Sequence, residues 1–261
     1  MPLTIAEYWH RGYPLALMLD YDGTLTPIVA DPTQAFLPPA GLELLRQVCR
    51  HPQIHVAIVS GRSLPQLLHF CRELTAEALI LCGLHGGEIY QLPEHRFLRQ
   101  PEREQLLGQL QPIRDMVLEE LNRCNWFDAG VRVEDKTYSI AVHYRHVSPE
   151  SKPLVIELLQ GLFRNHSALC APFKLQAGKE VLEILPRTFD KGDCVAFLWD
   201  FWQVVQGCYI GDDLTDEAAF AVVNQRGGLS IAVGKTPGTT AAQVICPEVA
   251  DVYRELVALG S

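Results

Sequence analysis

The chain has 261 residues, of which 48% are hydrophobic and 20% charged, and its formal net charge at pH 7 is −9. This length allows one large domain or two modest ones, and the composition is that of a folded protein rather than a disordered one. The acidic balance argues against a non-specific binder of nucleic acid or of membrane surfaces, because both need a basic excess. No apolar run approaches the roughly 20 residues of a membrane span, and the first residues lack the basic segment of a signal peptide. We therefore expect a cytoplasmic protein with no nucleic-acid or membrane partner. A monomer is also expected, although nothing in the composition bears on the oligomeric state.

Short apolar runs that end at glycine or polar residues alternate with helical patterns in both outer parts of the chain. Such runs are typical of strands buried on both faces, and their alternation with helices predicts a parallel sheet covered on both sides. The predicted strands span residues 15–19, 55–59, 79–82, 208–210 and 230–233, and predicted helices span 40–50, 63–74 and 215–223.

The middle of the chain predicts a different architecture. A long amphipathic helix over 102–122 precedes a hairpin whose strands, 131–133 and 138–144, flank residues 134–136. A second helix over 149–165 precedes a hairpin that joins 173–175 to 181–185 across 176–179. Apolar side chains alternate with polar ones in the first hairpin, which is typical of an antiparallel sheet. We expect an α+β module at 102–186, inserted into an α/β core formed by 1–101 and 187–261.

Eight cysteines are scattered along the chain, and no two stand in CxxC spacing. Structural zinc is therefore not predicted, and we expect mostly buried thiols in a reducing compartment.

Three of the predicted strands run directly into polar motifs: DYDGT at 20–24, SGR at 60–62 and GDDLTD at 211–216. Ligands of open parallel sheets bind beyond the carboxyl ends of the strands, so these motifs meet at one edge. Each motif alone fits a polar turn or a helix cap. Together they gather carboxylates that repel one another unless a cation lies among them, and an oxygen-rich site without thiolates suits Mg²⁺.

This combination, with Lys191 of a Lys-Gly pair as a fourth motif, resembles the haloacid-dehalogenase (HAD) superfamily of phosphatases. The resemblance implies that Asp20 attacks phosphorus and forms an aspartyl-phosphate, while Asp22 donates a proton to the leaving alcohol and later takes one from water. It also implies that Ser60 and Lys191 bind the phosphoryl oxygens. Lys179 is an alternative for the lysine, since a Lys-Gly pair after a strand is often a solvated loop.

The same resemblance implies which residues hold the metal. Asp20, the main-chain carbonyl of Asp22, and Asp212 are the expected ligands of Mg²⁺. Asp213 is expected beside them, and Asp216 is the alternative to it for direct contact with the ion.

Nearly the whole chain resembles one family within this superfamily, the trehalose-6-phosphate phosphatases. The matching strings are DYDGTLTPI at 20–28, VSGR at 59–62, GLHGGE at 83–88, VEDK at 133–136, HYR at 143–145, GKEVLEILP at 178–186 and GDDLTDE at 211–217. The resemblance implies a Rossmann-like parallel-sheet core with an inserted cap of type C2B. It further implies Mg²⁺-dependent hydrolysis of trehalose 6-phosphate, a step of trehalose biosynthesis by a phosphomonoester hydrolase.

The resemblance also assigns sugar-binding residues to the inserted module. Carboxylate and ammonium groups together satisfy hydroxyls that both donate and accept. The residues implied to bind the sugar are Glu134, Lys136, Arg145, Lys179 and Glu183, with Arg62 and His85 as further substrate contacts. The alternative is that the cap residues form solvated hairpin ion pairs, which contribute little.

Three other functions stay open at this point. One is a related sugar-phosphate phosphatase acting on glucosylglycerol phosphate, mannosylglycerate phosphate or sucrose phosphate. Another is a non-catalytic sugar-phosphate sensor, which the presence of both Asp20 and Asp22 disfavours. The last is a phosphotransferase that passes the phosphoryl group to a second alcohol.

Overall fold

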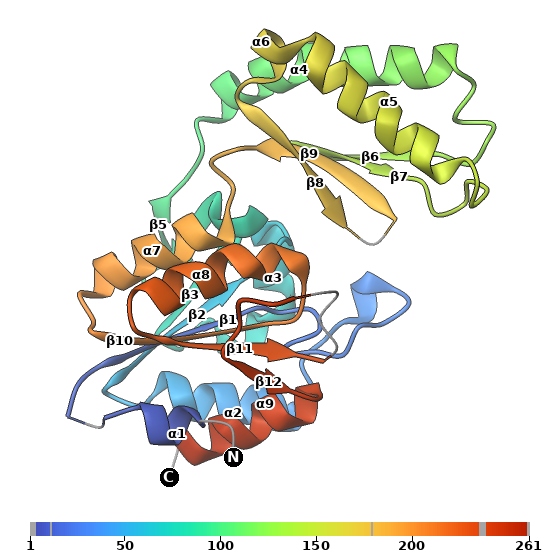
Figure 1. Ribbon diagram of the computed structural model, residues 1–261. Helices are drawn as coiled ribbons and strands as arrows, with labels where there is room; N and C mark the ends of the chain where they lie inside the picture. The colour runs from blue at the N-terminus through green and yellow to red at the C-terminus, as the bar shows by residue number, and fades with distance from the viewer. Residues whose placement is uncertain (1–3, 11, 179, 235–238, 260–261) are drawn as a thin grey trace. The chain divides into compact units, whose positions relative to one another are not determined.

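The structure is a computed structural model that describes residues 4–10, 12–178, 180–234 and 239–259 (Figure 1). The chain divides into two compact units, one of Met1–Gln100 with Phe189–Ser261 and one of Pro101–Thr188. These boundaries lie one or two residues from the expected divisions after 101 and 186. Each unit has its own sheet and its own apolar core, and each is described by itself below.

The larger unit is built on a mixed sheet in the order β12-β11-β10-β1-β2-β3-β4-β5 (Figure 1). Strands β12 to β3 are parallel, and β1 and β10 are buried at every position, as strands covered on both faces should be. The strands are β1 Leu15–Leu19, β2 Ile54–Val59, β3 Leu79–Gly83, β4 Glu88–Gln91, β5 Arg96–Arg99, β10 Gln206–Gly211, β11 Leu229–Val233 and β12 Val244–Cys246.

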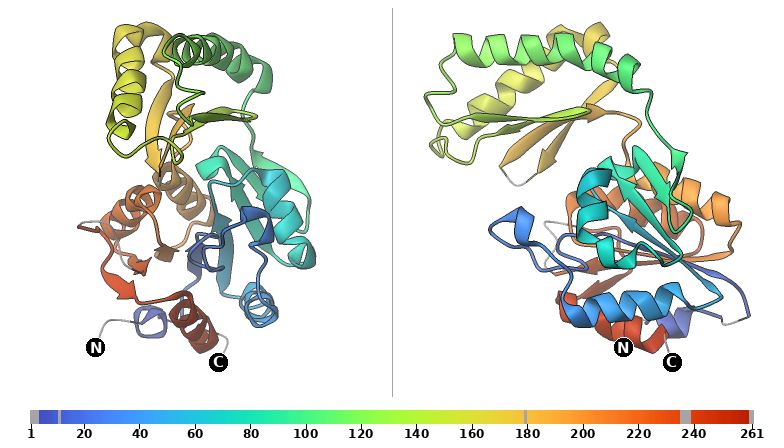
Figure 2. Two further views of the ribbon diagram at one scale, coloured as in Figure 1. Left: turned by 90° about the vertical axis from the view of Figure 1, so that its right-hand side faces the viewer. Right: turned by 180° about the vertical axis from the view of Figure 1, so that it is seen from behind.

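Helices cover both faces of this sheet (Figure 2). Leu15, Leu17 and Leu19 of β1 pack in the core on one face, whereas Ala16 and Met18 pack in the core on the other. The helices of the first face are α1 Ile5–Tyr8, α2 Pro39–Cys49, α3 Leu64–Phe70 and α9 Val249–Leu259, and those of the second are α7 Lys191–Trp202 and α8 Glu217–Gln225. This arrangement confirms the predicted α/β core.

Strands β4 and β5 form an antiparallel edge that the sequence pattern did not predict. The turn η3, Leu84–Gly86, joins β3 to β4 and is far too short for the crossover that a parallel strand needs. Both strands are only four residues long, and β5 reads RFLR, so neither has the apolar run by which a buried strand is recognised.

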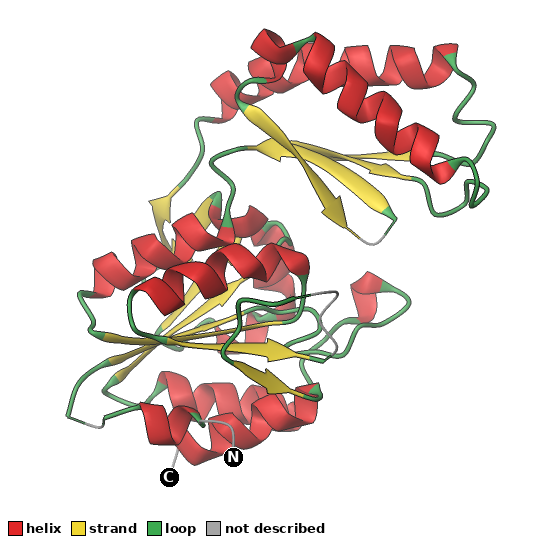
Figure 3. Cartoon of the chain, in the orientation of Figure 1, coloured by secondary structure: helices red, strands yellow, loops and turns green. Residues whose placement is uncertain are grey.

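The smaller unit is an antiparallel sheet in the order β6-β7-β9-β8 with helices packed on one face (Figure 3). Its core joins Ile113 and Val117 of the long helix to Ile140 and Val142 of the sheet. The elements are α4 Arg103–Arg123, β6 Arg132–Lys136, β7 Ser139–His143, α5 Lys152–Asn165, α6 Ser167–Cys170, β8 Phe173–Gly178 and β9 Val181–Pro186. The predicted α+β module with an antiparallel sheet is confirmed.

Both hairpin turns in this unit are tighter than predicted. Residues 134–136 continue β6 and residues 176–178 continue β8, where the sequence analysis placed loops. Charged and small residues here look like loop residues, but each backbone pairs with a neighbouring strand, so ladder hydrogen bonds outweigh local propensity.

The described part of the chain contains no helix with the length and apolar character that a membrane crossing requires. The eight cysteines are free thiols, and all but Cys124 are buried.

Candidate active site

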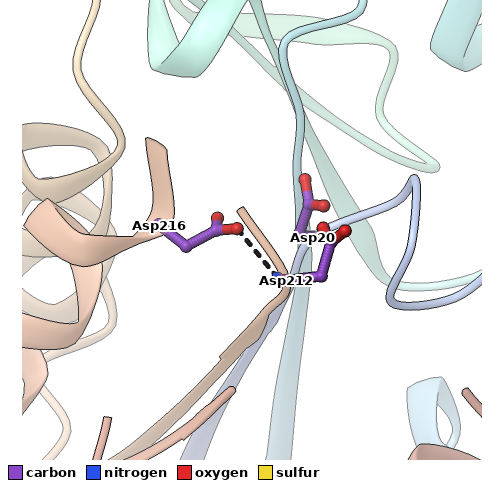
Figure 4. A group of neighbouring side chains, drawn as sticks. All are labelled: Asp20, Asp212 and Asp216. Carbon is purple, nitrogen blue, oxygen red and sulfur yellow. Dashed lines mark hydrogen bonds between the residues drawn. The ribbon is translucent and has the colours of Figure 1, made fainter. Parts of the chain in front are cut away.

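Two carboxylates stand side by side where adjacent parallel strands end (Figure 4). Asp20 follows β1 and Asp212 follows β10, and these strands pair in register from Leu15 with Gln206 to Leu19 with Ile210. One carboxylate oxygen from each of Asp20, Asp212 and Asp216 lies within 4.8 Å of the other two. The edge of the sheet therefore concentrates negative charge as the sequence motifs predicted.

Lys191 is the cation of this cluster. It is the first residue of α7, where the Asp190 side chain caps the helix by accepting from the backbone N–H groups of Gly192 and Asp193. Its Nζ lies 2.8 Å from Oδ1 of Asp20 and 2.7 Å from Oδ1 of Asp216. The lysine is 3% exposed, so the alternative that it is a solvated loop lysine is wrong. Lys179, the alternative phosphate-binding lysine, lies outside the described residues.

Asp216 is an orienting group within this network. Its Oδ1 accepts from Lys191 and, at 2.6 Å, from the hydroxyl of Tyr209. Its Oδ2 accepts from the backbone N–H groups of Asp212 at 3.0 Å and Asp213 at 2.9 Å. Four donors fill the acceptor positions of one carboxylate. We infer that Asp216 holds the lysine and the Asp212 loop in place, which leaves Asp20 and Asp212 as the better metal ligands.

Asp213 has a local structural contact. Its carboxylate accepts from the N–H of Leu214 at 2.7 Å and caps the short helix η4, Leu214–Asp216. Its side chain is exposed. A helix-cap role, one of the simple alternatives for the GDD motif, is thus met by Asp213.

The charge balance of the cluster fits a divalent cation. Burial raises the pKa of Asp20 well above its ordinary value despite the attraction of Lys191, and Asp216 and Asp212 raise it further. Burial, followed by the charge of Asp216, raises the pKa of Asp212 to about 7. Burial alone would lower the pKa of Lys191, but Asp20 and Asp216 outweigh it and the net shift is upward. Three carboxylates against one ammonium leave a surplus of negative charge that a cation would neutralise.

Gly23 allows the two carboxylate-bearing segments to approach closely. Its φ is +81°, a conformation that favours glycine, and a Cβ atom there would lie 2.0 Å from Oδ2 of Asp212. The DYDGT turn and the GDD turn can thus meet only because this position has no side chain.

Ser60 follows β2, which pairs with β1 on the side opposite to β10, and it is 2% exposed. Its Oγ accepts from the backbone N–H of Arg62 at 3.1 Å. A hydroxyl that accepts in this way still has its own O–H to donate. Ser60 is therefore suited to donate to an anion at the edge of the sheet.

Arg62 lies against Asp22. Its Nε and Nη2 bond the two carboxylate oxygens of Asp22, both at 2.6 Å. His85 lies close to the same segment: its backbone N–H donates to the carbonyl of Ser60 at 2.9 Å, and its ring approaches Gly61. The φ of His85 is +55°, uncommon for a residue with a side chain. Arg62, His85, Ser60 and Asp22 thus belong to one group of segments in the larger unit.

In the smaller unit the predicted sugar-binding residues fall into separate groups. Glu183 accepts from Lys136 Nζ at 3.3 Å and from the buried Ser139 hydroxyl at 2.5 Å. Glu134 instead pairs with His143, at 3.0 Å between Oε2 and Nε2.

Arg145 lies outside both of these groups. Its Nε is 3.4 Å from Oε2 of Glu180, which also bonds Lys152. The register aligns Glu134 with Ala141 and Ala141 with Glu183, so these positions form one row across the sheet.

Sequence reasoning did not single out Tyr209, Ser139 or His143 as site residues. Tyr209 stands in an apolar run and Ser139 in an alternating strand, so both look like ordinary strand residues. Two signals were available: Ser139 and His143 share the face of β7 that is opposite to Ile140 and Val142, and His143 lies in the matching HYR string at 143–145.

The chain is similar to known proteins over most of its length. The family model described as trehalose-phosphatase matches residues 18–245. Trehalose 6-phosphate phosphatase RA3 of Zea mays is 36% identical over 96% of this chain and 71% of its own length. Trehalose-phosphate phosphatase B of Arabidopsis thaliana is 33% identical over 89% of this chain, which spans only 62% of that relative.

Solved structures are similar over nearly the whole chain. The trehalose-6-phosphate phosphatase of Aspergillus fumigatus has a TM-score of 0.72 and 27% identity, covering 95% of this chain and 92% of that one. The C-terminal domain of the Candida albicans trehalose-6-phosphate phosphatase, at 22% identity, has a TM-score of 0.78, covers the same shares of both chains, and supports the fold alone.

Proposed function

This chain belongs to the trehalose-phosphatase family, and from that premise we propose that it hydrolyses trehalose 6-phosphate to trehalose and phosphate. The observation that carries the proposal is the buried network of Asp20, Lys191 and Asp216 beside Asp212. Such a cluster has no use in packing, because burying charged groups costs free energy that an apolar core would not lose. It is suited to bind a phosphoryl group and a cation together.

We propose that Asp20 is the nucleophile. One carboxylate oxygen of Asp20 bonds to phosphorus as the bond from phosphorus to the sugar oxygen breaks, which gives an aspartyl-phosphate. The released sugar oxygen takes a proton from Asp22, which is two residues away on the same turn. Water then attacks phosphorus, its proton returns to Asp22, and phosphate leaves Asp20 as a free carboxylate.

Ser60 and Lys191 are proposed to bind the other phosphoryl oxygens. Ser60 has an O–H to donate, and Lys191 brings a positive charge that is fixed by Asp216. Donors held in place before the reaction stabilise the charge that develops on the phosphoryl group.

Mg²⁺ is the proposed cofactor, and Asp20, Asp212 and the main-chain carbonyl of Asp22 would hold it. Bound there, a divalent cation neutralises phosphoryl charge and so strengthens binding of the substrate dianion. The raised pKa values of Asp20 and Asp212 support this assignment, since burial and then neighbouring carboxylates raise them and a bound cation would oppose both effects.

The second unit, Pro101–Thr188, is proposed to be the cap that reads the sugar. Glu183, Lys136 and Glu134 line one side of its sheet with acceptors and donors suited to hydroxyls. Arg145 and Lys179 are proposed to add to this set, and His85 to contact the substrate from the larger unit.

Phosphate release across a panel of sugar phosphates tests the proposal. The panel contains trehalose 6-phosphate, sucrose 6-phosphate, glucosylglycerol phosphate and mannosylglycerate phosphate, each with Mg²⁺ and with a chelator. We expect the highest kcat/KM on trehalose 6-phosphate and no turnover without metal. A preference for another sugar would redirect the assignment to a related phosphatase, and no release from any of them would contradict an enzyme.

Variants of the two aspartates test the chemistry. Asp20→Asn should lower kcat by about 1,000-fold or more, because it removes the nucleophile. Asp22→Asn should lower kcat strongly on trehalose 6-phosphate but less on p-nitrophenyl phosphate, whose leaving group needs no proton. Asp115→Asn, on the outer surface of α4, is the matched control and should retain wild-type turnover.

A further inference from the structure

The two-point contact between Arg62 and Asp22 is the least expected feature of the larger unit. The guanidinium bonds Oδ2 of Asp22 through Nε and Oδ1 through Nη2, both at 2.6 Å. Planar bidentate pairs of this kind fix the orientation of a carboxylate as well as its position. The Asp22 side chain is 40% exposed, so its rotamer is not set by burial.

Arg62 is itself held rigidly. Nη2 also donates to the carbonyl of Pro32 at 3.0 Å, and the guanidinium carbon lies 4.4 Å from the ring centroid of Phe70. The arginine side chain is only 10% exposed. Its backbone N–H bonds Ser60 Oγ, and its carbonyl accepts from Leu84 at 2.8 Å. An arginine fixed at both ends can serve as a rigid support.

Three of the five N–H groups of Arg62 are used by Asp22 and Pro32. Both two-point edges of the guanidinium include Nη2, whose two N–H groups are used, so neither edge is free for two-point contact with a sugar or phosphate oxygen. This contact explains why an arginine follows the phosphate-binding serine without requiring that it touch the substrate.

We propose that Arg62 is a positioning residue for Asp22, an inference that rests on the function proposed above. Asp22 has to reach the same oxygen position twice, first to give a proton to the sugar oxygen and then to take one from water. Misplacing an acid–base group by about 1 Å can cost roughly 100-fold in rate. Arg62 fixes the Asp22 carboxyl on its turn, and its effect on catalysis passes through Asp22.

A double-mutant cycle measured on two leaving groups tests this role. Arg62→Met keeps much of the packing against Phe70 and removes the two-point contact with Asp22. Arg62→Lys keeps the positive charge but cannot make the two-point contact. Each is combined with Asp22→Asn, and kcat and KM are measured on trehalose 6-phosphate and p-nitrophenyl phosphate.

On trehalose 6-phosphate, Arg62→Met should lower kcat about 10- to 100-fold, with a much smaller change in KM. The loss on p-nitrophenyl phosphate should be roughly tenfold smaller, because that leaving group depends little on Asp22. In the Asp22→Asn background, Arg62→Met should change kcat by no more than about twofold. On a logarithmic scale, kcat of Arg62→Lys should lie closer to that of Arg62→Met than to that of the wild type.

Arg50→Met is the matched control. Arg50 and Glu77 form a bidentate pair at 3.0 and 2.7 Å in the same unit, so this variant breaks an equivalent contact away from the site. This variant should have the kcat and KM of the wild type on both substrates. Circular dichroism and thermal unfolding check that the Arg62 variants fold. If Arg62→Met does not fold, Arg62→Lys is used in its place.

Several outcomes would overturn the inference. These are losses that add in the double mutant, an equal loss on both substrates, a rise in KM alone, or full rescue by lysine. If the wild type does not act on trehalose 6-phosphate, the proposed function fails. The cycle is then read on whichever alkyl phosphate the protein hydrolyses.

Discussion

Lys191 and Asp20 form a buried ion pair, with 2.8 Å between Nζ and Oδ1 and side-chain exposures of 3% and 6%. The lysine stands 171 residues after the aspartate, at the start of α7, and reaches the end of β1. Asp216 shares the same ammonium at 2.7 Å. One cation thus joins a carboxylate at the end of β1 to a carboxylate of η4, so removing it affects both.

Replacing Lys191 should damage both stability and activity. Lys191→Met leaves two buried carboxylates without their counter-charge, which typically costs about 3–5 kcal/mol of unfolding free energy. Turnover should fall at least about 100-fold on sugar phosphates and on p-nitrophenyl phosphate alike, because the phosphoryl group is common to both. Urea unfolding and steady-state kinetics measure the two effects.

Arg226→Met is the control for that experiment, since Arg226 pairs with the exposed Asp200 in the larger unit. An ion pair of this kind contributes about 0–1 kcal/mol. Wild-type turnover by Lys191→Met would show that the lysine is only structural.

In the metal-free protein, ionisation of Asp212 should lower the free energy of unfolding as pH rises. The pKa of Asp212 is 3.8 in a model compound and about 7 in the folded protein, because burial and then Asp216 raise it. Between these pH values the folded state holds a proton that the unfolded state has released, so this group lowers the free energy of unfolding as pH increases. Asp20 is shifted in the same direction and contributes with the same sign.

Thermal unfolding with Mg²⁺ and with a chelator measures this effect. The measurements run from pH 5 to pH 8, a range that includes the Asp212 pKa of about 7. The rise in Tm on adding Mg²⁺ should grow with pH and level off above about pH 7, because the cation competes with the proton for Asp212. Asp212→Asn should flatten both trends. A Mg²⁺ effect that is independent of pH would argue against metal binding by this carboxylate.

Glu183 should affect the sugar rather than the phosphate. Glu183→Gln weakens the bonds to Lys136 and Ser139 and should lower kcat/KM on trehalose 6-phosphate about 10- to 100-fold. Hydrolysis of p-nitrophenyl phosphate should fall much less, because that substrate has no sugar to bind. Glu120→Gln on α4, which breaks a surface pair with Arg123, is the control. Equal losses on the two substrates would indicate a structural role for Glu183.

Gly23 should not tolerate a methyl group. Gly23→Ala places a Cβ atom 2.0 Å from the Asp212 carboxylate at a φ of +81°, so Asp212 has to move. The backbone conformation alone should cost about 1–2 kcal/mol, and turnover should fall by at least about tenfold. Gly108→Ala is the contrasting control: it lies within α4 with open space around it and should stabilise the protein by about 0.5–1 kcal/mol. Wild-type kinetics for Gly23→Ala would contradict the close approach of the two turns.

Much of the architecture could be predicted from local patterns. The buried strands β1, β2 and β10 contain short apolar runs that end in polar motifs, and run length together with these boundaries distinguishes them from the helices between them. The edge strands β4 and β5 could not be predicted from the pattern because they are short and partly polar. The hairpin turns were placed too early because charged residues in β6 look like loop residues until their pairing with β7 is known.

The sequence by itself determined that Asp20, Ser60 and Asp212 lie near one another, because parallel strands deliver their ends to the same edge of a sheet. Only the tertiary structure decided which partners these groups have. Asp216 accepts hydrogen bonds from four donors, Asp213 caps the short helix η4, and Arg62 bonds the carboxylate of Asp22. The cap by Asp213 and the bonds from the Asp212 and Asp213 N–H groups to Asp216 are local contacts, which the spacing of the motif already allowed. The pairs of Lys191 with Asp216 and of Arg62 with Asp22 join residues that are distant in sequence, so their choice depends on packing and side-chain rotamers in three dimensions.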